Sequence, residues 1–154
     1  LTAGGPKVLE YNCRFGDPEI QPLLMRLRAD LVDLMIATCQ GKLDEVDLSW
    51  DPRCCCCCVM ASGGYPGGYE TGKTISGIAE AEAMDDVTVF QAGTAMKDDQ
   101  IVTAGGRVLN VCAMGKDLKH AQQQANAACE KIHFDGAYFR KDIGFRVMQT
   151  ESRL

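Results

Sequence analysis

The sequence predicts an α+β fold in which antiparallel strands are packed against an amphipathic helix. Short apolar or alternating runs separated by polar and glycine-rich turns are typical of antiparallel strands. An apolar residue recurs with helical spacing between residues 118 and 132. The length of 154 residues, 46% of them apolar, is enough for one compact domain or for the end of a larger domain with a small one attached.

The first predicted element is a strand at residues 8–15, ended by turn-forming residues. Alternate side chains of a strand point to opposite faces. We therefore expect Glu10, Asn12 and Arg14 to face a cleft. The other face is expected to join a core and is made of Leu9, Tyr11, Cys13 and Phe15.

One helix is predicted from Pro22 to Gly41. Its apolar residues recur at helical spacing, Pro22 suits a first helical turn, and Gly41 is a common stop. A polar bend follows at residues 44–52. The run Cys54–Ala61 then predicts a buried strand.

The second half predicts a short helical turn at residues 79–84 and antiparallel strands in the stretches VTVFQAGT and IVTAGGRVLNVCAMG. A second helix is predicted at residues 118–132, with Asp117 as its N-cap. The aromatic tail HFDGAYFRKDIGFR is expected to pack back on the sheet.

Charge and hydropathy exclude two classes of partner. The net charge of −5 and the absence of Lys/Arg clusters argue against a nucleic-acid surface, which needs excess positive charge. The apolar stretches fall short of the roughly 18 residues of a membrane span. We expect a cytoplasmic protein that binds neither nucleic acid nor a membrane.

Nine cysteines are present, and five of them are contiguous at Cys54–Cys58. This layout is not that of a disulfide scaffold and favours reduced thiols. Because cysteine behaves as a small buried hydrophobe, a structural strand is the preferred interpretation. The alternative is a non-catalytic thiol-rich metal-binding module, or an interaction module.

The polar face of the first predicted strand has the chemistry of a metal and phosphate site. The Glu10 carboxylate and the Asn12 amide oxygen, about 6 to 7 Å apart along a strand, can reach one divalent cation such as Mg²⁺. Arg14 adds a guanidinium fork for a phosphate or a carboxylate. The alternative is an exposed ion pair on an edge strand, worth less than about 1 kcal/mol.

The stretch EYNCRFGDPEIQPLL resembles the terminal ATP-grasp motif of the glycinamide ribonucleotide synthetase (phosphoribosylamine-glycine ligase) family. The stretches GKLDEVDLSWDPR, VFQAGTAMKDDQIVTAGGRVLNVCAMG and EKIHFDGAYFRKDIGFR resemble the carboxyl-terminal part of the same enzymes, in the same order. The resemblance covers nearly the whole chain, and the family's enzymes are considerably longer. Gln91 and Gly68 depart from it, standing where a His and an Asp are usual.

The resemblance implies an ATP-dependent ligase of purine biosynthesis that joins glycine to phosphoribosylamine through a glycyl phosphate. By position in the motif, Glu10 and Asn12 would hold Mg²⁺ or Mn²⁺ against the phosphates of ATP. Arg14 would be catalytic, stabilising charge on the transferring phosphoryl group.

The substrate-binding residues implied by the resemblance are Asp17 and Pro18, beside the glycine and amine pocket. Arg107 is a further candidate, because it lies in the glycine-flanked stretch TAGGRVL and could reach the ribose phosphate; an exposed hairpin arginine is the alternative.

The resemblance also implies a domain organisation. Residues 1–45 would be the end of an ATP-grasp domain, and residues 46–154 a small antiparallel β domain that closes over the site. The phosphate-binding loop and the lysines that hold ATP lie upstream in the family. We therefore expect this chain to need the upstream ATP-grasp portion as its partner and to be inactive alone.

Overall fold

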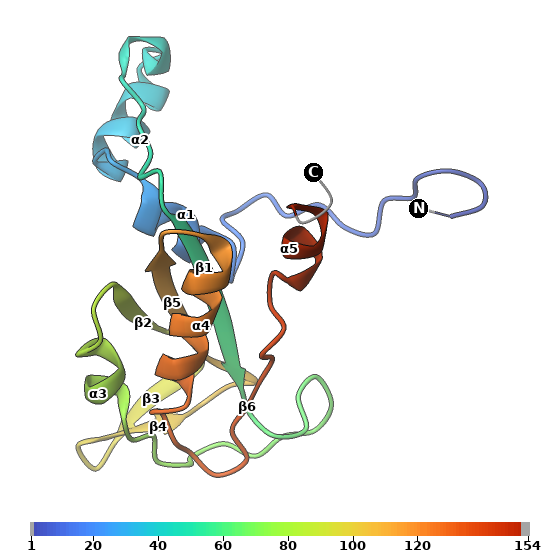
Figure 1. Ribbon diagram of the computed structural model, residues 1–154, viewed down its shortest axis with the longest axis vertical. Helices are drawn as coiled ribbons and strands as arrows, with labels where there is room; N and C mark the ends of the chain where they lie inside the picture. The colour runs from blue at the N-terminus through green and yellow to red at the C-terminus, as the bar shows by residue number, and fades with distance from the viewer. Residues whose placement is uncertain (1, 152–154) are drawn as a thin grey trace.

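The computed structural model describes residues 2–151 and has the α+β architecture that the sequence predicts. Its centre is an antiparallel sheet with the strand order β2-β5-β1-β6, and β3 and β4 form a separate two-stranded sheet (Figure 1). The strands are β1 (Cys54–Ala61), β2 (Val87–Gln91), β3 (Thr94–Lys97), β4 (Gln100–Thr103), β5 (Arg107–Gly115) and β6 (Tyr138–Phe139). The helices are α1 (Ile20–Arg26), α2 (Leu31–Cys39), α3 (Ile78–Glu82), α4 (Leu118–Cys129) and α5 (Phe145–Glu151), with a 3-10 turn η1 (Leu43–Glu45).

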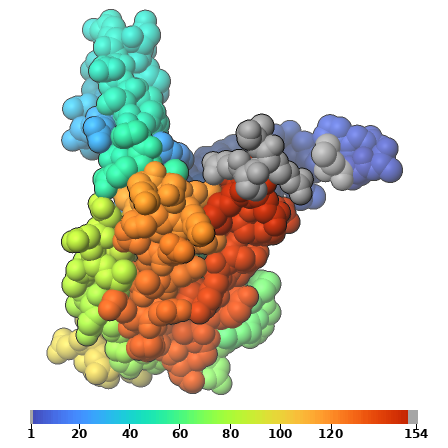
Figure 2. All heavy atoms as spheres, viewed as in Figure 1, coloured from blue at the N-terminus to red at the C-terminus, as the bar shows by residue number. Residues whose placement is uncertain are grey.

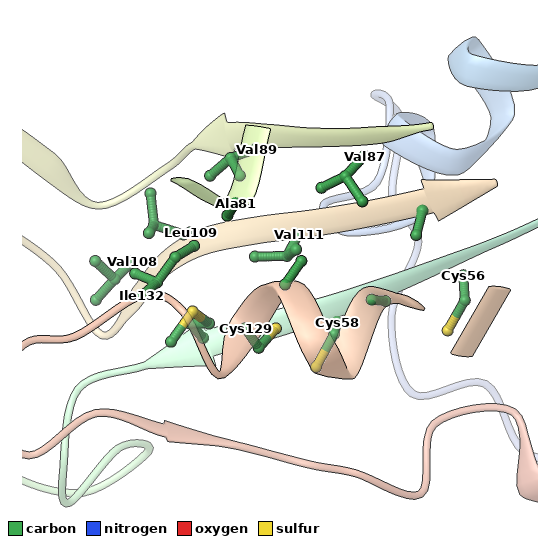
Figure 3. Packing of buried hydrophobic residues seen from close by; sticks show 14 of the residues in the cluster. Cys56, Cys58, Ala81, Val87, Val89, Val108, Leu109, Val111, Cys129 and Ile132 are labelled. Carbon is green, nitrogen blue, oxygen red and sulfur yellow. The ribbon is translucent and has the colours of Figure 1, made fainter. Parts of the chain in front are cut away.

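The main core lies between the sheet and α4 (Figure 3). Residues of β5 such as Val111 are fully buried there. The side of α4 that faces the sheet is made of small, fully buried residues, which let the helix lie close to the strands: Ala121, Ala125, Ala128 and Cys129. The Asp117 side chain caps this helix by accepting a hydrogen bond from the His120 backbone N–H at 2.7 Å. The predicted cap is confirmed, and the helix ends three residues earlier than predicted.

The opposite face of the sheet is covered by α1. Cys57 and Cys112 are paired across β1 and β5, and the Cys55 Sγ lies 3.9 Å from the Met25 Sδ on α1. The same face carries Asn110, which is 1% exposed. This face of the sheet therefore carries a buried amide as well as thiols, whereas the cluster on the other side is apolar and includes the thiols of Cys56, Cys58 and Cys129.

The predicted strand at residues 8–15 is wrong. This segment runs away from the body of the molecule without pairing with any described strand (Figure 1). Its apolar side chains do not join a core: Leu9 is 99% exposed and Tyr11 83% exposed. The alternation is present in the sequence, but a strand needs a neighbouring strand, and the described residues supply none here.

The predicted single helix at residues 22–41 is two helices, α1 and α2. The Asp30 side chain accepts a hydrogen bond from the Val32 backbone N–H at 2.8 Å and so starts a new helix. Before it, Leu27 is extended and bridges to Trp50. The apolar residues keep their helical spacing across this break. For that reason the sequence did not predict that Asp30 is an N-cap. Gly41, with φ of 68°, ends α2 as predicted.

The segment of α2 and η1 stands out from the rest of the molecule, as Figure 2 shows. Asp51 anchors its base: the buried carboxylate contacts Arg28 at 3.1 Å and Arg53 at 3.1 Å, and the Asp51 carbonyl oxygen accepts from Arg26 at 3.2 Å. Hydrogen bonds from Arg53, together with the nearby Arg28 guanidinium, hold the Asp51 pKa well below its usual range.

We expect acid to weaken this anchor. A carboxyl whose pKa is lower in the folded than in the unfolded state stabilises the fold above its unfolded pKa of about 4, and that stability is lost as the pH falls below it. Urea unfolding at a series of pH values from 6 to 2 measures the loss. Asp51→Asn should reduce the pH dependence, whereas Asp44→Asn, at an exposed position, should leave it unchanged. Equal pH profiles for wild type and Asp51→Asn would contradict this role.

None of the helices in the described chain combines the length and the apolar content that a membrane span requires.

Candidate metal and substrate site

The predicted site residues lie around one cavity of about 480 Å³. Seven of the lining residues come from the N-terminal segment and one, Arg107, comes from the start of β5. The lining residues are Glu10, Asn12, Arg14, Gly16, Asp17, Pro18, Glu19 and Arg107. The N-terminal segment is not a strand, but it brings together the residues that the strand prediction placed on one face.

Glu10 and Asn12 are hydrogen-bonded to each other. The Asn12 Nδ2 donates to the Glu10 Oε1 at 3.0 Å. Because a carboxylate can only accept, this bond turns the Asn12 amide nitrogen toward Glu10 and leaves the Asn12 Oδ1 available. No described residue hydrogen-bonds to the Asn12 Oδ1 or the Glu10 Oε2.

These two oxygens fit a hard divalent cation, since Mg²⁺ and Mn²⁺ prefer carboxylate and carbonyl oxygens. They are an incomplete ligand set. Among residues 2–151, no group of three or more His, Cys, Asp and Glu side chains is placed to hold a metal ion. The pair therefore suits an ion that takes its other ligands from water and from substrate phosphates, as Mg²⁺ often does.

Arg14 lies on the same cavity and is only lightly engaged. Its Nη1 donates to the Phe15 carbonyl oxygen at 3.0 Å. A guanidinium carries five N–H donors, so most of those of Arg14 are available to an anion in the cavity.

Asp17 connects the N-terminal segment to the sheet. Its backbone carbonyl oxygen accepts from the Arg107 Nη1 at 2.6 Å, and its carboxylate lies 3.6 Å from the Arg107 Nη2. The Asp17 Oδ1 also accepts from the Asn110 Nδ2 at 2.6 Å and from the Gln21 Nε2 at 2.8 Å. The carboxylate is thus held in one position by groups from α1 and β5.

Sequence reasoning missed Asn110 and Gln21. An asparagine inside the apolar run RVLNVCAMG is an available signal, because a buried polar side chain needs a hydrogen-bonding partner. The bonds to Asp17 fix both amide orientations. They leave the Asn110 Oδ1 and the Gln21 Oε1 buried without a partner in the described chain.

The cysteine tract forms β1, and its thiols alternate between the two faces of the sheet. All nine cysteines are free. Cys56 and Cys58 join the core under α4 (Figure 3), and burial raises the pKa of Cys56 to about 12. A hydrogen bond with Cys58, together with burial, also raises the pKa of Cys129 far above its usual value. These thiols pack as small apolar side chains, in agreement with the structural interpretation of the tract.

We expect thiol reactivity to follow this burial. Cys13 and Cys39 are exposed and should be alkylated first by iodoacetamide in the native protein, whereas Cys56, Cys58 and Cys129 should react only after unfolding. Mass spectrometry of peptides after a timed reaction measures the order. Elemental analysis of protein purified without added metal is the companion measurement, and stoichiometric zinc or copper would contradict the packing role and favour a metal-binding module.

Comparisons with known proteins agree on one family. The family profile described as "Phosphoribosylglycinamide synthetase, C domain" matches residues 55–146. The phosphoribosylamine-glycine ligase of Pseudomonas aeruginosa is 52% identical over 149 residues, which are 97% of this chain and 34% of that protein. The enzyme of the same name from Vibrio cholerae is 50% identical over 150 residues, which are 97% of this chain and 35% of that protein.

The crystal structure of phosphoribosylamine-glycine ligase from Thermotoga maritima superposes with a TM-score of 0.63 at 29% sequence identity. That match covers 91% of this chain and 34% of the other. The chain therefore spans about a third of the length of the relatives it matches. On the profile match and the identity to the curated ligases, the chain belongs to the phosphoribosylglycinamide synthetase family.

Proposed function

We propose that this chain is part of an ATP-dependent ligase that joins glycine to 5-phosphoribosylamine, giving glycinamide ribonucleotide in purine biosynthesis. The observation that supports it most is the shared cavity of Glu10, Asn12, Arg14, Asp17 and Arg107 in a chain of this family. The names of its relatives give the reaction, and the cavity contains the residue types that the reaction needs.

In the first step the glycine carboxylate attacks the γ-phosphorus of ATP, giving a glycyl phosphate and ADP. Glu10 and Asn12 would hold Mg²⁺ or Mn²⁺, and the ion would neutralise phosphate charge. Arg14 stabilises the negative charge of the transferring phosphoryl group. Phosphoryl transfer depends mainly on positioning and charge neutralisation, which these side chains can supply.

In the second step the amine of phosphoribosylamine attacks the glycyl carbonyl carbon, the bond from that carbon to the phosphate oxygen breaks, and inorganic phosphate leaves while the nitrogen gives up a proton to water. The segment of Asp17 and Pro18 lines the region where glycine and the amine meet. The Asp17 carboxylate can accept a hydrogen bond from an amine or ammonium group, and Asn110 and Gln21 hold it in place for this. Arg107 joins the same cavity from the sheet and is the candidate for the ribose phosphate.

The ATP-grasp remainder of the enzyme is the proposed partner of this chain. The segment around α2 contributes to an apolar hollow of about 620 Å³ that no described part of the chain fills. Its lining is almost entirely apolar and includes Leu34, Met35 and Leu48. Because the relatives are about three times as long as this chain, the remaining part of such an enzyme is the occupant we propose for this surface.

The test is to join the chain to the missing part of the ligase and to measure ATP hydrolysis. We expect hydrolysis to require both glycine and phosphoribosylamine, and the product to be glycinamide ribonucleotide. The chain alone should show no such activity. A soluble, folded full-length protein that hydrolyses ATP without regard to either substrate, or not at all, would overturn the proposal.

A further inference from the structure

Three thiols meet on the face of the sheet that α1 covers. Cys57 of β1 pairs with Cys112 of β5 in the antiparallel register, and Cys55 lies two residues along β1 on the same face. Hydrogen bonding to the Cys55 and Cys57 sulfurs, together with burial, raises the pKa of Cys112 far above its usual value. Both β1 sulfurs therefore contact the one thiol of β5.

The direct pair has the spacing that a disulfide requires. Directly paired residues of an antiparallel sheet have Cα atoms about 4.5 to 5.5 Å apart, and disulfides join Cα atoms about 4.4 to 6.8 Å apart. Cys57 and Cys112 can therefore be bonded without a change of strand register. Cys55 pairs with Met114 and is only a diagonal neighbour of Cys112. Diagonal neighbours are about 7 to 8 Å apart, which is beyond that range.

The same pair can be reached from solvent. Cys57 is partly exposed, whereas Cys112 is fully buried, so a small oxidant meets Cys57 first. Cys58 and Cys129 form a second hydrogen-bonded pair on the other face of the sheet. They are 1% and 0% exposed and lie in the core under α4. Of the two pairs, the one on the α1 face combines bonding reach with access.

Cys55 supplies negative charge beside the pair. The hydrogen bond with Cys112 and the nearby Arg26 guanidinium lower the pKa of Cys55, against the effect of burial. Arg26 is held in place by two hydrogen bonds to the Asp51 carbonyl oxygen, both of 3.2 Å. Because the thiolate and not the thiol is the nucleophile, Cys112 must lose its proton to react. Cys55 is placed to accept that proton.

We propose that Cys57 and Cys112 are a redox-active pair, which a peroxide converts into a disulfide between β1 and β5. The Cys57 thiolate attacks one oxygen of hydrogen peroxide, so that an S–O bond forms, the O–O bond breaks and hydroxide leaves. Cys112 then gives its proton to Cys55 and attacks the Cys57 sulfur, so that an S–S bond forms, the S–O bond breaks and a second hydroxide leaves. Two electrons pass from the sulfurs to the peroxide, and the two protons that the thiols lose convert both hydroxides to water.

The proposed bond lies beside the residues that hold Asp17. Asn110 is two residues from Cys112 on the same face, and its Nδ2 donates to the Asp17 Oδ1 at 2.6 Å. A disulfide needs Cβ atoms about 3.5 to 4.5 Å apart, whereas paired Cβ atoms of a sheet are about 4.5 to 5.5 Å apart. Closing the bond therefore draws the two strands together next to this hydrogen bond. Oxidation should disturb the position of the Asp17 carboxylate.

Mass spectrometry of the chain after treatment with hydrogen peroxide tests the pair directly. Free thiols are blocked with iodoacetamide, and the chain is digested with trypsin without reduction. Cleavage after Lys and Arg leaves the cysteine tract in residues 54–73 and Cys112 in residues 108–116. We expect these two peptides to be linked, fragmentation to place the bond at Cys57, and dithiothreitol to separate them.

Cys57→Ser should abolish the linked peptides. The matched control is Cys54→Ser, which removes another partly exposed thiol of the same strand; Cys54 pairs with Gly115, and its loss should leave the link unchanged. Three results would overturn the inference: no link although Cys13 is oxidised, a link that persists in folded Cys57→Ser, or a link from the tract to the peptide of Cys129 that forms first. Fragmentation of the wild-type peptides gives the answer without any variant.

Turnover of the full-length ligase tests the effect at Asp17, and this part rests on the proposed function. Peroxide should lower the turnover of the wild type and dithiothreitol should restore it, whereas Cys57→Ser should resist the same treatment. Equal losses in the two proteins would overturn the link to Asp17. If the untreated ligase lacks phosphoribosylamine-dependent turnover while the chain forms the bond, the proposed function fails and the redox-active pair stands.

Discussion

Replacing Gly77 with alanine is expected to lower the free energy of unfolding by about 3 kcal/mol or more. Gly77 has a φ of 84°, a conformation that costs an L-residue about 1–2 kcal/mol. A Cβ atom there would also overlap the carbonyl oxygen of Lys131, which is backbone and cannot swing away. Next to it, Ser76 and His133 exchange two backbone hydrogen bonds at 3.0 Å, so any shift also breaks the link between these segments.

Gly41→Ala is the matched control. Gly41 also has a positive φ, of 68°, but a Cβ atom there would meet nothing within 4 Å. This variant should lose only the roughly 1–2 kcal/mol of conformational strain. Urea unfolding followed by circular dichroism gives both values, and their difference isolates the backbone overlap. Equal losses in the two variants would show that the approach to Lys131 is unimportant.

The elements predicted correctly have signals within their own residues. β1 is a run of small apolar side chains at Cys54–Ala61 and forms a strand at those residues. The second helix has a cap at Asp117 and small apolar residues at helical spacing. The tail returns to the sheet as predicted, because β6 pairs with β1, although the sequence did not predict the short helix α5.

The elements that were predicted wrongly are those whose structure depends on neighbouring segments of the chain. Residues 8–15 alternate as a strand does, but alternation describes side-chain direction and does not supply the neighbouring strand that hydrogen bonding requires. Residues 22–41 keep an apolar helical period through a break, because the same apolar surface continues from α1 across Leu27 to α2. Periodicity therefore predicted which residues face the same way and missed where the backbone turns.

The candidate site was also predicted only in part: residues related by a local pattern were found, and residues joined by contacts between distant segments were missed. Glu10, Asn12 and Arg14 were grouped by their spacing, and they do line one cavity, although not on a strand. Arg107 joins them through a contact with Asp17 that spans 90 residues. The residues that sequence reasoning missed, such as Asn110, matter only through the packing of β5 against the N-terminal segment. No local pattern can indicate such a contact, apart from the polarity of Asn110 in an apolar strand.

Glu10→Gln in the full-length ligase is expected to reduce turnover by about 10²-fold or more, the usual effect of removing one group that stabilises transition-state charge. Glutamine keeps a carbonyl oxygen that can accept the Asn12 Nδ2 hydrogen bond at the same place. The local geometry should therefore persist while the negative charge is lost. Steady-state assays at a series of Mg²⁺ concentrations measure both effects, and we expect a higher Mg²⁺ requirement as well as a lower kcat.

The control for charge alone is Glu82→Gln on α3, an exposed glutamate that does not line the cavity. Both variants lose one negative charge, so a general electrostatic effect would appear in both, whereas loss of a metal ligand would appear only at Glu10. Unchanged turnover and Mg²⁺ dependence in Glu10→Gln would remove this residue from the metal site. Because Glu10 positions Asn12 through their hydrogen bond, that result would also remove Asn12 from the proposed metal site.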